Sequence, residues 1–190
     1  MTMTEATCGL PILRRMRKTF VRLALLALLV PVVATGALKA GPGDGTLSVE
    51  DGRGKVNLDA RGGVFGRLDR GTITVYDKTP ADTSYPIVTG ADQPEVFLTD
   101  GGVRYRGNGL RVRIIGGGFK LQIQGRGIDL SVVGKGSGFI EADNSPEPGV
   151  YSLEGADCRK SRSSCEALPL PGLRFKLVPA EKARSKPGSN

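Results

Sequence analysis

Glycine recurs every nine residues through the middle of this chain, and apolar residues alternate with other residues between the glycines. The glycine units are Gly107-Asn108-Gly109, Gly116-Gly117-Gly118, Gly125-Arg126-Gly127 and Gly134-Lys135-Gly136. The alternating apolar residues are Leu110, Val112, Ile114, Phe119, Leu121, Ile123, Ile128, Leu130 and Val132. Alternation with a period of two is typical of a strand with one buried face, and glycine supplies the positive φ that tight turns need. The pattern therefore predicts an all-β protein.

The parity of the apolar residues predicts how the strands pair. If each loop consists of two residues, as at Asn108-Gly109, every apolar residue falls on one face of a single sheet. A three-residue loop without a bulge would turn alternate strands over. We therefore predict an antiparallel meander with two-residue turns, for which Asn-Gly is a strong signal. Short strands with turns at regular intervals favour a sandwich or a barrel.

A solenoid or β-roll, in which nine residues form one half-coil, has the same period and is the alternative architecture. The calcium-binding nonapeptide roll requires aspartate at the sixth place of each repeat. That place holds Val112, Leu121, Leu130 and Phe139. The sequence therefore lacks the ligands that would make this repeat a calcium site.

The N-terminus has the layout of a secretory signal peptide. Five basic residues precede an apolar run at positions 23–38, and small residues follow. The run contains Pro31 and is shorter than the ~20 residues that span a bilayer. Residues 1–40 are therefore predicted to be a signal peptide, with an uncleaved membrane anchor as the alternative. Either one places the rest of the chain outside the cytoplasm, secreted or membrane-anchored.

Residues 41–179 are predicted to form a single β domain, and the polar residues 180–190 a disordered tail. The whole chain carries a net charge of +8, but residues 41–190 hold 21 Lys plus Arg against 18 Asp plus Glu, a net of +3. Most of the basicity thus belongs to the leader. This distribution, and the lack of aromatic side chains on the polar face of the predicted meander, argue against nucleic acid as a partner.

Two cysteines, Cys158 and Cys165, lie close together in a polar segment. In an oxidising compartment we expect them to form a disulfide that closes a surface loop. A zinc site is not expected, because the chain has no histidine and residues 41–190 have no other cysteine. The run at 107–133 and this cysteine pair together resemble secreted β-rich proteins of high-GC Gram-positive bacteria that have no known activity. The resemblance implies export.

The predicted meander brings arginines together on its polar face. Arg106 would lie across from Arg111, and Arg104 across from Arg113, with Lys120 nearby. Like charges directly opposite each other destabilise a sheet, which suggests that an anion covers them. Guanidinium groups suit phosphate and carboxylate. The five residues are thus a candidate anion-binding site, unless solvent or acidic residues of the chain itself cover them.

Catalysis has little support in the sequence. Without histidine, Ser–His and Cys–His nucleophile pairs are excluded. The glycine-rich run at 134–138 does not match a phosphate loop, and no acidic motif stands out. We expect no catalytic, metal-binding or cofactor-binding residues. The sequence favours an exported, non-enzymatic domain of the cell envelope, structural or binding an anionic envelope polymer or lipid head group. The alternatives are a carboxylate-based glycan-acting enzyme and a self-assembling, solenoid-like structural protein.

Overall fold

The computed structural model describes residues 43–179, so the predicted leader and the predicted C-terminal tail lie outside the described residues. Two long strands dominate this part of the chain, β1 (Gly45–Asp77) and β4 (Val103–Ala142). The short elements are β2 (Ile87–Thr89), β3 (Val96–Phe97), β5 (Val150–Ser152), the 3-10 helix η1 (Arg162–Ser164), β6 (Glu166–Ala167) and β7 (Leu173–Leu177). All strand pairs are antiparallel. The predicted all-β, antiparallel class is confirmed.

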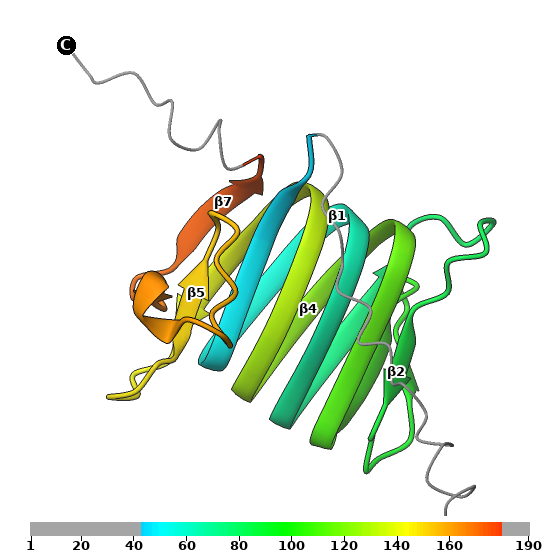
Figure 1. Cartoon of the computed structure of the whole chain (residues 1–190). Helices are drawn as coiled ribbons and strands as arrows, with labels where there is room; N and C mark the ends of the chain where they lie inside the picture. The colour runs from blue at the N-terminus through cyan, green and yellow to red at the C-terminus, as the bar shows by residue number, and fades with distance from the viewer. Residues whose placement is uncertain (1–42, 180–190) are drawn as a thin grey trace, which may run out of the picture. The chain divides into compact units, whose positions relative to one another are not determined.

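The strands β1 and β4 wind around each other. Gly71 of β1 pairs with both Gly107 and Gly125 of β4, one on each side, and these two partners are two glycine repeats apart. Val64 likewise pairs with both Ile114 and Val132. One full turn of β4 therefore spans two of the nine-residue repeats, and one half-turn spans a single repeat. Figure 1 shows the result, in which successive turns of the two strands alternate along the coil.

The predicted pairing through two-residue turns is wrong. In the described chain β4 pairs with β1 and with β2, β3 and β7 at its margins, and not with itself. Val112, for example, lies opposite Gly66 and Val88 rather than opposite Tyr105. Each glycine unit is a bend of the coil instead of a hairpin. The half-coil has the same nine-residue period and the same parity as the hairpin, which is why parity alone favoured the wrong partner.

The coil has two faces that enclose the core as the layers of a sandwich do. The first face contains β1 residues 55–61 and 72–77 and β4 residues 103–106, 118–124 and 135–141, with β3 and β7 at its two edges. The second face contains β1 residues 46–52 and 63–69 and β4 residues 110–115 and 128–133. Its edges are formed by β2 and by β5 with β6. The sheet is not closed, because β2 and β6 are its ends.

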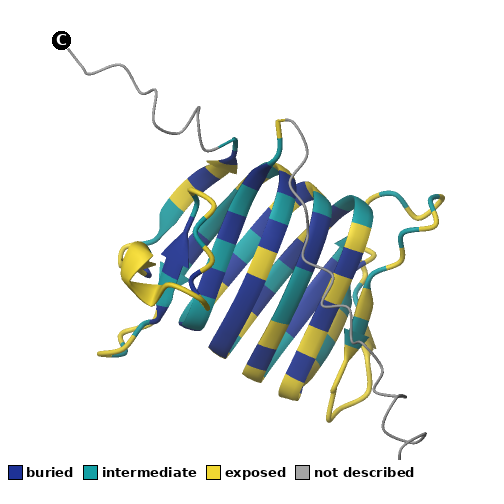
Figure 2. Cartoon of the chain, viewed as in Figure 1, coloured by how far each residue is buried: buried dark blue, intermediate teal, exposed yellow. Residues whose placement is uncertain are grey.

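Apolar side chains form continuous rows inside the coil. Leu121 lies opposite Leu58 on one side and opposite Val75 on the other. All nine alternating apolar residues of the glycine repeat are buried, which confirms the predicted core. Figure 2 shows buried and more exposed residues alternating along each turn. Burying one such side chain contributes about 1.5–3 kcal/mol, so the interior of the coil is the main source of stability.

Glycine is needed at the bends because the backbones of neighbouring turns meet there. Gly54, Gly125, Gly71 and Gly107 pair in succession and so stack at one bend. Gly71 has φ +157°, and a Cβ added to it would collide with the carbonyl oxygen of Gln124. The glycine register of the sequence is therefore the row of bends of the coil.

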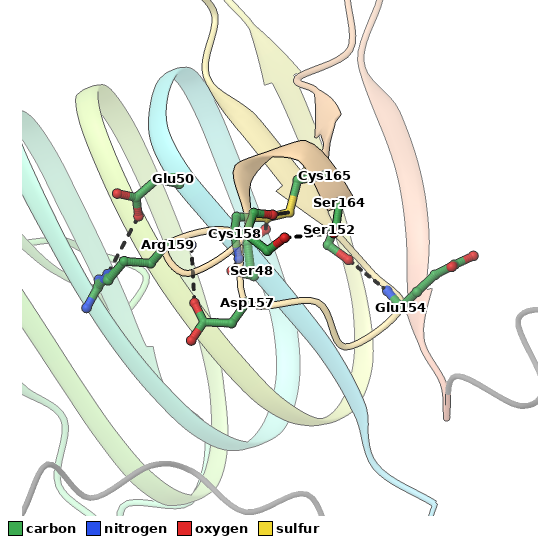
Figure 3. Close-up of a disulfide and its surroundings, with 10 residues drawn as sticks. Ser48, Glu50, Ser152, Glu154, Asp157, Cys158, Arg159, Ser164 and Cys165 are labelled. Atoms are coloured by element: carbon green, nitrogen blue, oxygen red, sulfur yellow. Dashed lines mark hydrogen bonds and ion pairs between the residues drawn. A yellow bond between two sulfur atoms is a disulfide. The ribbon is translucent and has the colours of Figure 1, made fainter.

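The disulfide-bonded segment borders the second face. Cys158 and Cys165 form the predicted disulfide. The backbone N–H of Cys158 donates to Oγ of Ser48 in β1 at 3.1 Å, and Nε of Arg159 lies 3.6 Å from a carboxylate oxygen of Glu50 (Figure 3). The segment is thus attached to the outermost turn of β1 on that face.

Candidate anion-binding site

The five predicted anion-binding residues are exposed but do not form one patch. Arg104, Arg106 and Lys120 lie on the first face, whereas Arg111 and Arg113 lie on the second. The predicted opposition of arginines is therefore wrong. The bend at Gly107-Asn108-Gly109 carries β4 from one face to the other, so residues on its two sides do not meet.

The actual neighbours of these residues are mostly uncharged. Arg104 lies opposite Thr74, and its Nε donates to Thr74 Oγ1 at 3.5 Å. The guanidinium carbon of Arg113 lies 6.0 Å from the centre of the Phe65 ring, a cation–π contact.

Lys120 and Arg111 also have neighbours within this chain. Nζ of Lys120 lies 5.1 Å from the centre of the Tyr76 ring. Arg111 does face an arginine, Arg67, but Arg67 already contacts Asp129 at 3.3 Å and Asp69 at 3.4 Å. Cation–π contacts at exposed sites contribute about 0.5–1 kcal/mol. The predicted residues thus have separate, local roles in the coil.

A different set of arginines lies side by side. Arg126 of β4 is opposite both Arg53 and Arg70 of β1, on its two sides. The three residues come from successive turns at one bend, and we call them the arginine column. Neighbouring strands are about 4.8 Å apart, so the column presents a guanidinium on each successive turn. Arg70 and Arg126 are exposed and Arg53 is half-buried.

The arginine column lines a hollow of about 290 Å³, together with Asn108, Gly127 and two acids, Asp51 and Asp69. A carboxylate oxygen of Asp69 lies 3.4 Å from Arg67, outside the column. Within residues 43–179 the three column arginines form no ion pair, and Arg53 Nη1 donates to Ser145 Oγ at 3.2 Å. The column therefore has guanidinium donors without a carboxylate acceptor.

A second hollow of about 470 Å³ lies beside Arg70 and Arg126. Its charged lining also includes Lys55, Glu141 and Asp143. Glu141 is paired with Lys55 at 3.4 Å, and a carboxylate oxygen of Asp143 accepts from the Ser145 N–H at 3.0 Å. Both acids therefore have partners of their own, and Arg70 and Arg126 are accessible from both hollows.

The sequence holds a signal for the column that parity reasoning did not use. Each column arginine directly neighbours a bend glycine, as in Arg53-Gly54, Arg70-Gly71 and Gly125-Arg126. Arg53 and Arg70 are separated in the sequence by nearly one full turn of the coil. If both long strands are assumed to wind with the same nine-residue half-turn, these arginines fall at the same bend.

Acidic residues elsewhere have structural roles. Asp129 is buried, contacts Arg67, and accepts from the backbone N–H of Asp51 at 3.0 Å. Burial raises the pKa of Glu50, and the negative charge of Asp129 raises it further. Glu50 is in turn contacted by Arg159. Neither Glu50 nor Asp129 lines either hollow, so these acids give no specific support to glycan hydrolysis.

In residues 43–179, no group of three or more histidine, cysteine or acidic side chains is placed to hold a metal ion. The same residues include no helix with the length and apolar character needed to cross a membrane. The chain matches no protein-family model, no curated protein and no solved structure. The geometry of the arginine column is therefore the basis for a functional proposal.

Proposed function

We propose that this chain is an exported, non-enzymatic β domain of the cell envelope or exterior that binds an anionic envelope polymer or lipid head group through the arginine column. The observation that carries the proposal is the stacking of Arg53, Arg126 and Arg70 on successive turns without an ion-pair partner in the described chain. Export rests on the N-terminal sequence pattern, and the disulfide agrees with an oxidising compartment.

The spacing of the column suits a ligand with repeated negative charges. An anionic chain lying across the turns would meet a guanidinium about every 4.8 Å. Each guanidinium can donate two parallel hydrogen bonds to a phosphate or carboxylate. Asn108 lies opposite Arg70 and lines the same hollow, but its side-chain nitrogen donates to Asp92 at 2.6 Å, so the row of free donors ends at Arg70. A ligand would also relieve the repulsion between the opposed arginines.

Binding of the purified full chain to polyphosphate, a soluble phosphate polymer, tests the proposal. The variant R70Q/R126Q removes two charges from the column, and R104Q/R106Q removes two exposed charges from the first face as a matched control. At about 0.7 kcal/mol for each lost contact, the column variant should bind about tenfold more weakly. The control should stay within about twofold of the original chain.

Vesicles distinguish the two sources of anionic ligand. Binding to phosphatidylglycerol vesicles without binding to polyphosphate would assign the column to lipid head groups, and the reverse would assign it to a polymer. Because all variants carry the same leader, its basic residues contribute equally to each measurement. Equal losses in both variants would show that net charge, rather than the column, controls binding, and would overturn the proposal.

A further inference from the structure

One end of the coil carries exposed apolar side chains. The connection between β1 and β4 contains the edge strands β2 and β3, and we call this region the β2–β3 end. Tyr85, Ile87, Val96 and Phe97 are exposed there, Phe97 by 77% and Tyr85 by 67%. Six large apolar residues of the described chain are exposed in total, and four of them belong to this end. Such clusters on a protein surface mark interaction sites.

The β2–β3 end also presents free backbone edges. β2 and β3 pair with β4 on one side, and neither pairs with another described strand on its other side. At the far end of the first face, β7 likewise pairs only with β4, and we call its free side the β7 edge. Figure 1 shows β2 and β7 at opposite ends of the coil. Unpaired edges are templates for pairing with another chain.

The two ends differ in charge. Residues 79–102, which include the β2–β3 end, contain Asp82, Asp92, Glu95 and Asp100 and no Lys or Arg. The β7 edge carries Arg174 and Lys176, both exposed. Two of these acids accept hydrogen bonds from uncharged side chains of the same chain: Asp92 accepts from the amide of Asn108, and Asp100 accepts from the hydroxyl of Tyr76. The outermost segments at the two ends therefore carry opposite charge, while the β4 turns next to β2 and β3 carry the exposed Arg104, Arg111 and Arg113.

We propose that the β2–β3 end of one copy docks on the β7 edge of a second copy, so that copies stack head to tail along the coil. This interface goes beyond the proposed function and does not use the arginine column. Two β2–β3 ends facing each other would bring two acidic 79–102 segments together, which is less favourable than contact with the basic β7 edge. Because the contact joins different surfaces, each added copy exposes a new β2–β3 end, and assembly does not stop at a dimer.

The first and second faces end in different strands at the end of the coil that carries β7. On the second face, β5 and β6 follow the outermost turn of β1, and residues 158–165 are attached there by the Cys158–Ser48 hydrogen bond. On the first face, β7 is the last strand and has no described neighbour beyond it. The first face thus offers an edge on which β3 of a second copy can continue the sheet.

Sedimentation of the full chain tests this stacking. From about 1 to about 200 µM, the average mass should rise with concentration and pass beyond that of a dimer. The variant F97S should weaken association at least tenfold, because Phe97 is the most exposed apolar side chain of the β2–β3 end. Gln124→Ser, which changes an exposed residue in the middle of the first face, between Lys55 and Thr72, is the control and should leave association unchanged.

A charge exchange tests the orientation of the copies. Glu95→Lys and Lys176→Glu should each weaken association, and the double variant E95K/K176E should recover it. A chain that stays monomeric at every concentration, a mass that levels off at the dimer, or an F97S variant that associates like the original chain would overturn the proposal. R70Q/R126Q should associate normally, so failure of the stacking and failure of anion binding are distinguishable.

Discussion

Arg70 and Arg126 lie directly opposite each other on neighbouring turns of β1 and β4, and Arg53 lies on the other side of Arg126. Like charges in directly opposed positions destabilise a sheet. Glycines neighbour all three arginines, so the bend at which the backbones approach most closely is also the place where positive charge gathers. The fold therefore keeps an unfavourable arrangement of three arginines at this bend of the coil.

The opposed arginines predict that Arg126→Gln stabilises the fold. The substitution removes repulsion toward both Arg53 and Arg70, and should raise the free energy of unfolding by about 0.5 kcal/mol at low salt. The gain should disappear at about 0.5 M salt, where exposed charges are screened. Urea unfolding at the two salt concentrations measures it. Arg106→Gln, opposite Thr72, should show no such gain.

The bend glycines predict a second effect on stability. Gly71→Ala places a Cβ against the carbonyl oxygen of Gln124, so one turn must move away from the next. We expect a loss of about 3 kcal/mol in the free energy of unfolding, in the range of substitutions that strain the backbone and disturb packing. Gly109→Ala is the control, because Gly109 also has positive φ (+74°) but a Cβ there meets nothing within 4 Å. It should cost only about 1–2 kcal/mol. Equal losses would show that φ, rather than close approach, explains the glycine.

The sequence predicts the strands and the core, because the alternation of apolar and other residues sets the buried face of a strand whichever strand pairs with it. Leu121 is buried whether its neighbour is Ile114, as in a hairpin, or Leu58, as in the coil. The partner itself is a long-range choice between segments with the same parity. One sign of the coil is present in the first block, where the pair Leu47 and Val49 recurs nine positions later as Val56 and Leu58.

The residues that form the candidate site depend on which strand segments pair with each other. A hairpin at Asn108-Gly109 would have joined Arg106 to Arg111, whereas the coil joins Arg126 to Arg53 and Arg70. Residues on opposite sides of a bend are close in the sequence but lie on different faces. The disulfide, in contrast, was predictable, because Cys158 and Cys165 are too close in the sequence for the fold to separate them widely.

The disulfide predicts a modest contribution to stability. In the chain-entropy model, closing so short a loop contributes about 2–3 kcal/mol. C158S/C165S should lose this amount in urea unfolding. A reductant added to the original chain should reproduce the loss, and it should have no effect on the variant. A variant as stable as the oxidised chain would show that the contacts to Ser48 and Glu50 hold the segment without the bond.

Export predicts a defined fate for the N-terminus. Expressed in a bacterium with its own leader, the chain should be recovered outside the cytoplasm, with a mature N-terminus near residues 35–41 if the leader is cleaved. Mass spectrometry of the intact protein measures the cleavage position. An uncleaved chain in the membrane fraction would instead support the anchor. A chain that stays in the cytoplasm with its cysteines reduced would contradict export.

The pKa of Tyr151 predicts a loss of stability at high pH. Burial, the hydrogen bond from its hydroxyl to Glu166 at 2.9 Å and the negative charge of Glu166 together raise this pKa to about 12. Between pH 10, near the ordinary value of tyrosine, and pH 12 the unfolded chain loses this proton while the folded chain keeps it. The unfolded state then binds fewer protons, so the free energy of unfolding falls as the pH rises, by roughly 2 kcal/mol from this residue.

Tyr151→Phe isolates this contribution. The variant should lose the part of the pH dependence between pH 10 and 12 that Tyr151 supplies, and Tyr85→Phe, which removes the hydroxyl of an exposed tyrosine, is the control. Unfolding in urea at several pH values measures both variants against the original chain. Because the folded state holds the proton of Tyr151 more tightly, stability that is complete below pH 10 must be lost above it. A pH dependence identical in Tyr151→Phe and the original chain would contradict the assignment.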